Sequence, residues 1–139
     1  MTVFVRDEDE GICSRNHRVF RPDLASASDA KNSFVEVALR EGLLPKLRLL
    51  HRNVAAQGEL LGPGVQGNPY RLPQAAFFCF DLFDIDSRQY IEPAARREIC
   101  RQIGLKQVPL LDEHRLGRSG KGKVRSALVI AKLFCVCWR

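Results

Sequence analysis

The order of apolar and polar positions along the chain predicts short strands mixed with helices. Stretches that alternate, or that are continuously apolar and rich in β-branched and aromatic residues, indicate strands. The predicted strands are residues 2–6, 12–20, 54–62, 75–85, 87–91 and 108–111. The predicted helices are residues 33–44, 45–53 and 93–104. Because strands and helices do not alternate regularly, the pattern favours an α+β fold with antiparallel sheets and flanking helices.

Turn and capping residues mark the ends of these elements. A polar, acidic turn after the first strand predicts an opening hairpin. Asp29 or Asn32 stands where its side chain can cap the first helix. Pro93 lies near the start of the third helix and Gly104 follows its end, which are favoured positions for these two residue types.

The composition describes a single domain without a membrane segment. The chain has 139 residues, of which 45% are hydrophobic and 27% charged, so it is neither disordered nor membrane-like by composition. The longest apolar run, 127–138, is interrupted by Lys132 and is too short to cross a bilayer. No basic region followed by an apolar region opens the chain, so we expect no secretory signal and a cytoplasmic protein.

The cysteines predict reduced thiols rather than disulfides or a metal site. Their number is five and no two have C-x-x-C spacing. Cys135 and Cys137 form a C-x-C pair, which is a weak metal signal, and the three histidines are scattered. We therefore expect free cysteines in a reducing compartment and no bound metal held by these side chains.

Charge divides the chain into two parts, residues 1–113 and a basic tail at 114–139. The net charge is +6, and no acidic residue follows Glu113. The basic residues of the tail are Arg115, Arg118, Lys121, Lys123, Arg125, Lys132 and Arg139. Such a segment can neutralise phosphates, but charge alone favours a solvated tail.

The glycine-rich loop 62–67 spells G-x-G-x-x-G, which is typical of dinucleotide sites. Asp81 ends a strand about 20 residues further on, as that motif requires. Only nine residues, two of them prolines, separate Gly67 from Phe77. A helix cannot form there and cross back to the sheet, so the pyrophosphate would have no helix N-terminus to face. We therefore exclude a dinucleotide-binding fold.

An acid and an aromatic cluster flank this loop. Glu59 lies near the end of one strand, and Phe77, Phe78 and Phe80 belong to the next strand, which is apolar enough to be buried on both faces. An exposed acid and an ordinary core explain these residues without any function. In a nucleotide site, Glu59 would accept hydrogen bonds from ribose hydroxyls, and Phe78 and Phe80, expected on one face, would stack on a base.

Three stretches together resemble a known family. "GICSRN" at 11–16, "QGELLGPGVQGN" at 57–68 and "FFCFDLFDI" at 77–85 are similar to the nucleotidyltransferase domain of ATP-dependent RNA ligases, in the branch with bacterial and protist enzymes. The resemblance covers roughly residues 1–111. It implies a lysine that attacks ATP to form lysyl-AMP, transfer of AMP to an RNA 5′-phosphate, and sealing by a 3′-hydroxyl, as in RNA repair.

The resemblance also implies roles for individual residues. Glu59 would hold the ribose and Phe80 would stack on the adenine. Arg15 would contact phosphate or the RNA end. The residues implied in RNA contact are Ser14, Arg15 and Asn16, and those implied in positioning the loop are Gln57, Gly58 and Asn68. ATP as the AMP donor, Mg²⁺, and RNA with 5′-phosphate and 3′-hydroxyl ends follow from the family.

Two family motifs are missing from the sequence. The nucleophilic lysine of K-x-D-G belongs just before Met1, and Lys31 and Lys46 match no family position. Ser126 and Ala127 stand where a metal-binding Glu-Gly pair is expected, and Lys132 has no site built around it. We therefore expect a nucleotidyltransferase domain truncated at both ends that forms no AMP adduct alone.

Three alternatives remain open at this stage. The chain can be one part of a split ligase, with an upstream fragment that supplies the missing strand in trans. It can be a non-catalytic RNA- or nucleotide-binding module, whose RNA binding would depend on salt but not on ATP. It can also be a gene fragment without a function.

Overall fold

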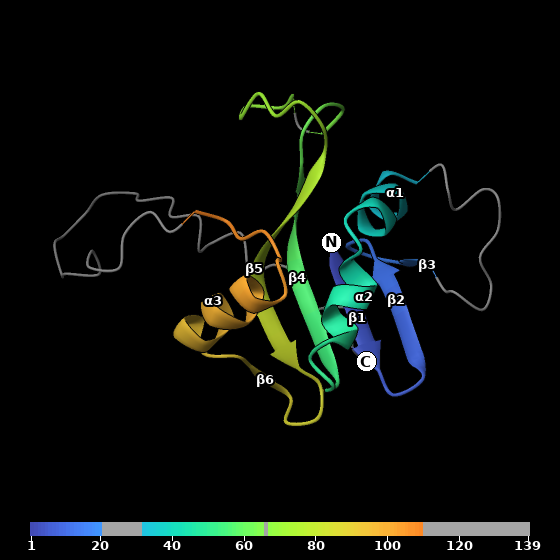
Figure 1. The fold of residues 1–139 in the computed structure, drawn as a ribbon. Coiled ribbons are helices and arrows are strands. Elements are labelled where there is room, and N and C mark those ends of the chain that lie inside the picture. Colours follow the sequence, from blue (N-terminus) through green and yellow to red (C-terminus); the bar gives the residue numbers. More distant parts are fainter. Residues whose placement is uncertain (21–31, 66, 110–139) are drawn as a thin grey trace, which may run out of the picture.

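The described chain folds around one antiparallel sheet with helices. The computed structural model describes residues 1–20, 32–65 and 67–109. Its strands are β1 (Thr2–Arg6), β2 (Asp9–Cys13), β3 (Arg18–Phe20), β4 (Val54–Leu61), β5 (Ala76–Asp84) and β6 (Gln89–Tyr90). Its helices are α1 (Ser33–Arg40), α2 (Leu43–Arg48) and α3 (Pro93–Gln102). The six strands have the order β3-β2-β1-β4-β5-β6, which confirms the α+β expectation (Figure 1).

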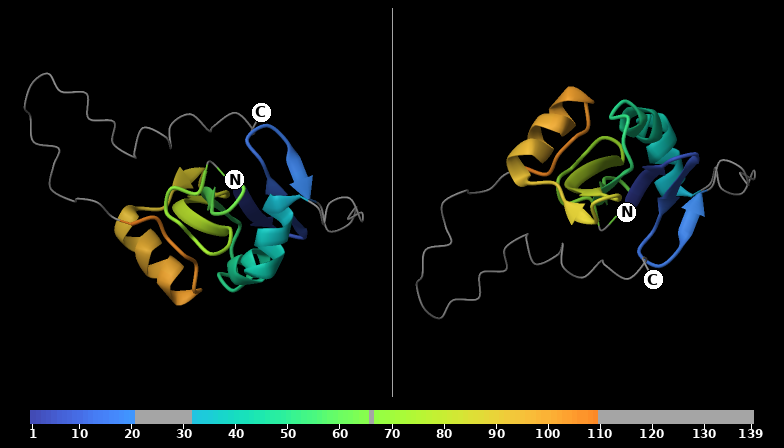
Figure 2. Two further views of the ribbon diagram at one scale, coloured as in Figure 1. Left: turned by 90° about the horizontal axis from the view of Figure 1, so that it is seen from above. Right: turned by 90° about the horizontal axis from the view of Figure 1, so that it is seen from below.

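The helices lie on one side of the sheet, as both views of Figure 2 show. The core lies between the helices and the sheet, and apolar side chains of both form it. Its most deeply buried side chains are Val3, Ile12, Val35, Val37, Leu43, Leu47, Val54, Phe77, Cys79, Leu82 and Cys100. Successive residues of a strand point to opposite faces, so the residues that alternate with this set define the opposite face of the sheet. That opposite face carries Gln57 and Glu59 of β4, whereas Gly58 lies on the core face.

The central hairpin of β4 and β5 depends on one glycine. A Cβ atom at Gly58 would lie 2.5 Å from the ring of Phe77 and 2.3 Å from the carbonyl oxygen of Phe78. The Phe77 ring therefore packs directly against the backbone of β4, and its side chain is completely buried. Any larger residue at this position would push the two central strands apart.

The predicted second strand, 12–20, is wrong because two strands replace it. β2 begins within the acidic stretch that was expected to be a turn, and Ser14–His17 form a turn before β3. Arg18 explains the difference, since its guanidinium donates to the Asp9 carboxylate at 2.6 Å and to the Glu10 backbone oxygen at 2.5 Å. These contacts give the acidic residues partners within the sheet, which the alternation of apolar residues does not reveal.

The predicted helix 33–44 is also wrong in its extent. It ends at Arg40, and Gly42 adopts a left-handed conformation with φ 62° before α2 begins at Leu43. The predicted cap is confirmed for Asn32, whose side chain accepts a hydrogen bond from the Phe34 amide at 2.9 Å, while Asp29 lies outside the described residues. The glycine is a stronger stop than the continuing apolar repeat.

The remaining predicted elements agree in part. Pro93 begins α3 and Gly104, with φ 64°, follows it as expected. The strand at 75–85 exists, but its second half is only partly buried, so burial on both faces is wrong. At 108–109 there is no strand, and only Gln107 bridges to Cys79; residues 110–111 lie outside the described residues. None of the described helices is long and apolar enough to cross a membrane.

Candidate functional site

A row of side chains crosses four strands on the face opposite the helices. Thr2 pairs with Cys13 on one side and with Gln57 on the other, and Gln57 pairs with Asp81. Because paired residues share a face, these four side chains lie side by side. The hydroxyl of Tyr90 donates to the Oε1 atom of Gln57 at 3.3 Å, which orients the Gln57 amide.

Glu59 belongs to the next row of the same face. It follows Gln57 by two residues on β4, and it pairs with Phe78 of β5. Its side chain is half-buried and forms no hydrogen bond or ion pair with another described residue. Burial lowers the pKa of the Met1 α-amino group, and the nearby Glu59 charge partly opposes that shift. A half-buried carboxylate of this kind can accept hydrogen bonds from a bound hydroxyl.

The register between β4 and β5 shifts by one residue at Phe80. Gly58 pairs with Cys79 while Gln57 pairs with Asp81, so Phe80 is an extra residue of β5 without a partner on β4. The expectation that Phe78 and Phe80 share a face assumed unbroken alternation, and the bulge removes that basis. Because of the bulge, the alternation of the strand does not determine which face the half-buried Phe80 ring occupies.

Arg96 of α3 holds the bulge from the edge of the sheet. Its Nη1 atom donates to the carbonyl oxygen of Phe80 and, at 2.9 Å, to Oδ1 of Asp81. The two charged side chains are 15% and 28% exposed, so solvent screens them only in part. Burial raises the pKa of the Asp81 carboxyl, and the Arg96 charge and hydrogen bond oppose that rise.

The predicted RNA-contact residues form the turn between β2 and β3. Ser14 closes this turn, because its Oγ donates to the His17 carbonyl oxygen at 3.2 Å and accepts from the His17 amide at 3.3 Å. Arg15 and Asn16 are exposed at its tip. Since Cys13 lies two strands from Gln57, roughly 10 Å away, the turn is at the same end of the sheet as Gln57 and Glu59.

The loop between β4 and β5 is held by Asn68. The Asn68 side chain donates to the Leu72 carbonyl oxygen and accepts from the Leu72 amide, each at 2.9 Å. Gly62 has a φ of 137°, and a Cβ atom there would lie 2.5 Å from the Cα atom of Ala75. The described part of the loop, 62–65 and 67–75, contains no helix, in agreement with the exclusion of a dinucleotide fold.

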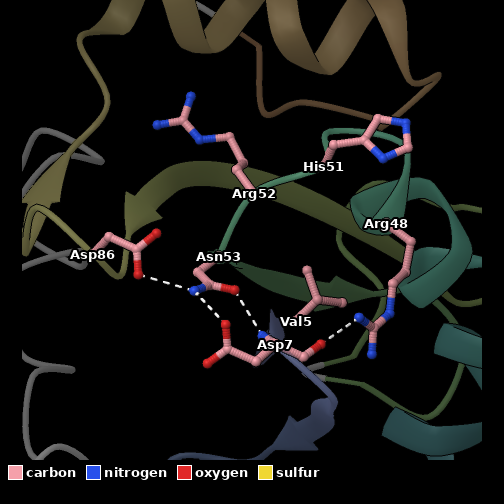
Figure 3. A pocket seen from close by; sticks show the side chains of 7 residues that line it. All are labelled: Val5, Asp7, Arg48, His51, Arg52, Asn53 and Asp86. Carbon is pink, nitrogen blue, oxygen red and sulfur yellow. Dashed lines mark hydrogen bonds between the residues drawn. The ribbon is translucent and has the colours of Figure 1, made fainter.

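A polar cavity lies at the opposite end of the sheet and contains none of the predicted site residues. Its volume is about 390 Å³, and it is lined by Val5, Asp7, Arg48, His51, Arg52, Asn53 and Asp86. Figure 3 shows Asn53 between the two acids, with its Nδ2 atom donating to Asp7 at 3.1 Å and to Asp86 at 2.9 Å. Sequence reasoning missed this cavity, because its residues come from β1, the end of α2 and three connecting segments without a shared motif.

The remaining predictions concern metal ligands, lysines and the basic tail. Among residues 1–20, 32–65 and 67–109 no group of three His, Cys, Asp or Glu side chains is arranged to hold a metal ion. The expectations for Lys31, Ser126, Ala127, Lys132, the C-x-C pair and the tail fall outside the described residues. So does Gln66 of the glycine-rich loop.

Comparisons with known proteins identify the family. The family model described as RNA ligase matches residues 1–126. Solved structures of Naegleria gruberi RNA ligase are also similar to this chain. A variant with ATP and Mn has 35% identity and a TM-score of 0.69, and a variant with AMP and Mn has 35% identity and a TM-score of 0.70. The enzyme with PPi has 34% identity and a TM-score of 0.70. Each match covers 80% of this chain and 32% of the other, so the chain spans about a third of the length of these ligases. No curated protein matches the chain. Because the family model covers most of the chain and the solved relatives share its fold, this chain belongs to the family of ATP-dependent RNA ligases, with a nucleotidyltransferase-type fold.

Proposed function

We propose that the chain is part of an ATP-dependent RNA ligase and that the sheet face opposite the helices binds the adenylate. One observation carries this proposal. The half-buried Glu59 carboxylate forms no hydrogen bond with another described residue, and the Met1 α-amino group is a nearby opposite charge. Glu59 shares a face with Gln57 and with its cross-strand partner Phe78, two residues before Phe80. An acceptor beside an aromatic ring matches a ribose attached to a base.

The family resemblance assigns one part of the ligand to each residue. Glu59 accepts hydrogen bonds from the ribose hydroxyls, and the Phe80 ring stacks on the adenine. Arg15, with Ser14 and Asn16 in the same turn, contacts the phosphate or the RNA end, where a guanidinium is suited to phosphate oxygens. Gln57, Gly58 and Asn68 keep the strand and its loop in place for these contacts.

ATP is the proposed AMP donor, and the RNA substrate carries 5′-phosphate and 3′-hydroxyl ends. The solved relatives contain ATP or AMP with manganese, and Mg²⁺ is the expected metal for this chain. The described residues offer no cluster of metal ligands, so no step of the proposal depends on a metal held by them. What these residues supply is binding and orientation of the nucleotide, which is most of the protein's part in phosphoryl chemistry.

The two described lysines are not suited to act as the nucleophile. The Nζ atom of Lys46 donates to the Gly104 carbonyl oxygen at 2.9 Å, and that of Lys106 is 2.6 Å from the Glu41 carboxylate. Gly104 follows the end of α3 and Glu41 is the C-cap residue of α1, so both partners belong to the helical elements. Since neither described lysine is placed for attack and the sequence contains no K-x-D-G motif, we expect the chain to bind the nucleotide without forming lysyl-AMP.

Calorimetric titration of AMP into the whole chain tests the binding proposal. We expect Glu59→Gln to weaken AMP binding about tenfold, because an amide replaces a charged acceptor. Glu98→Gln is the matched control, since Glu98 is a 50% exposed carboxylate on α3. Equal AMP affinity in the chain and in Glu59→Gln would exclude Glu59 as the ribose acceptor.

Incubation with α-labelled ATP and Mg²⁺, followed by denaturing electrophoresis, tests the expectation that the chain forms no lysyl-AMP. We expect no labelled band at the mass of the chain. A labelled band would show that a lysine of this sequence acts as nucleophile and would contradict the expectation. Label that is restored by a peptide with a K-x-D-G strand would support an upstream fragment as a partner.

A further inference from the structure

The Arg96 side chain of α3 holds the part of β5 that carries Phe80, and the helix cap determines where Arg96 lies. Glu92 caps the helix by accepting from the amides of Ala94 and Ala95 at 2.8 and 3.2 Å, which fixes where its first turn begins. Arg96 follows in the next turn and reaches the edge of β5, where its guanidinium contacts the Phe80 carbonyl oxygen and the Asp81 carboxylate.

The bulge needs this contact because no described strand covers the edge of β5 there. On one side, Cys79 exchanges hydrogen bonds with the backbone of Lys106 and Val108, at 2.8 and 3.0 Å. On the other side, β6 pairs only with Phe83 and Asp84. Between these pairings the Phe80 carbonyl receives its hydrogen bond from Arg96. A carbonyl held by a side chain depends on that side chain, unlike one held by a strand ladder.

The arrangement of the guanidinium indicates a fixed position rather than a loose surface contact. The Arg96 side chain is 15% exposed, and its Nε atom is buried without a hydrogen-bond partner among the described residues. The contacts that place the side chain are those of Nη1 with the Phe80 carbonyl oxygen and the Asp81 carboxylate, and they offset the cost of leaving the buried Nε donor unpaired. Arg96 therefore connects the placement of α3 to the conformation of the bulge.

We propose that Arg96 is a positioning residue for adenine recognition, which fixes the β5 bulge so that the Phe80 ring is presented to the base. This inference rests on the proposed function and extends it to a residue outside the three motifs of the resemblance. Arg96 itself does not touch the nucleotide. Its effect is specific to the base, since the ribose and phosphate contacts come from Glu59 and the β2–β3 turn.

The test separates base recognition from general stability by using two ligands. Dissociation constants for AMP and for ribose 5-phosphate are measured by NMR titration for the whole chain, for Arg96→Met and for Arg96→Lys. Arg101→Met is the control, because Arg101 lies on the same helix, is 73% exposed and contacts Glu98. Thermal unfolding of each variant is recorded beside the titrations.

We expect Arg96→Met to weaken AMP binding about tenfold, as expected for the loss of one stacked base, while ribose 5-phosphate affinity stays within about twofold. Arg96→Lys, which keeps the positive charge and N–H donors but not the planar guanidinium, should recover part of the loss, and Arg101→Met should match the unchanged chain. An equal loss for both ligands, or none for AMP, would overturn the inference. Failure of the unchanged chain to bind AMP would instead overturn the proposed function.

A ligand-free measurement decides the case independently of nucleotide binding. If Arg96 fixes the bulge, the ring resonances of Phe80 shift and amide exchange at residues 79–81 accelerates in Arg96→Lys and Arg96→Met, but not in Arg101→Met. Unchanged resonances and exchange rates in folded Arg96 variants would show that the bulge forms without the guanidinium, which contradicts the inference.

Discussion

The two ends of the sheet carry similar residue types but differ in how their polar groups are satisfied. At the cavity end, Asn53 joins Asp7 and Asp86, Arg48 donates to Glu10 at 2.9 Å, and Arg52 contacts Asp84. At the other end, the Glu59 carboxylate forms no hydrogen bond with another described residue, and its charged neighbour is the Met1 α-amino group. Polar groups that satisfy one another stabilise a fold, whereas a half-buried acceptor left without a partner is suited to a ligand.

The largest expected effect concerns the strand pair on which both ends depend. Gly58→Ala should lower the free energy of unfolding by about 3 kcal/mol, because the new Cβ atom would overlap Phe77 and the Phe78 carbonyl oxygen. Urea unfolding measures the change. Gly64→Ala is the control: its φ is 76° with no atom within 4 Å, so only about 1 kcal/mol of backbone strain is expected. Equal costs would contradict close packing at Gly58.

A second prediction applies to the cavity end. Asn53→Ala removes hydrogen bonds to the Asp7 amide and to the Asp7 and Asp86 carboxylates. We expect a loss of about 2 kcal/mol in the free energy of unfolding and no change in AMP affinity. Urea unfolding and AMP titration of the same sample provide both values. A tenfold loss of AMP affinity in a folded variant would mean that the two ends are not functionally distinct.

The third prediction concerns Phe80, at the end of the sheet opposite the Asn53 cavity. Phe80→Ala should weaken AMP binding about tenfold, which corresponds to about 1.4 kcal/mol, since the base loses its stacking partner. Stability should fall less than for a core aromatic, because Phe80 is only half-buried. Phe34→Ala is the matched control, as a half-buried phenylalanine of α1 on the helical side of the sheet. Similar AMP affinities in both variants would exclude Phe80 as the stacking residue.

The smallest expected effect is an opposite pH dependence at two aspartates of β5. Hydrogen bonds from Ser87 and Arg52 lower the pKa of Asp84 from 3.8 to about 2, so its stabilisation is present above pH 3.8 and is lost as the pH falls toward 2. Solvent screening limits this contribution to about 1 kcal/mol. Burial raises the pKa of Asp81 above 3.8 in the folded state, so the folded protein takes up a proton here before the unfolded chain does. The Asp81 carboxyl therefore contributes a gain in stability as the pH falls toward 3.8.

Urea unfolding between pH 2 and 6 separates the two groups. Asp84→Asn should lower stability at pH 6 and flatten its loss below pH 4. Asp81→Asn should remove a component of the opposite sign. The same slope in both variants would show that the two carboxyl groups do not differ in the way their contacts indicate.

Much of the fold follows from local signals in the sequence. Three helix ends agree with their local signals: Asn32 caps α1, Pro93 begins α3 and Gly104 follows α3. Each residue acts through its own backbone or side chain, so its effect can be read from the sequence. β4 and β5 were predictable from their apolar content. The split between β2 and β3 is not predictable in this way, since it depends on Arg18 reaching Asp9 nine residues away. The apolar repeat continues across the break at Gly42 and conceals it.

The candidate site was predictable only as far as its motifs. Gln57, Glu59 and the aromatic residues of β5 came from the sequence, but their mutual placement depends on a one-residue shift in register at Phe80. No periodicity reveals such a bulge. The role of Arg96 was equally hidden, because it lies 16 residues from Phe80 and contacts it only through the packing of α3 on the sheet.

The measurement that tests the central claim most directly is an NMR titration of the 139-residue chain with AMP, followed at every assigned backbone amide. The account predicts that chemical shifts change at residues 57–59 and 78–81 and in the Ser14–His17 turn, and stay unchanged around Asn53 and Asp86. Shift changes centred on the Asn53 cavity, or none at millimolar AMP, would contradict it.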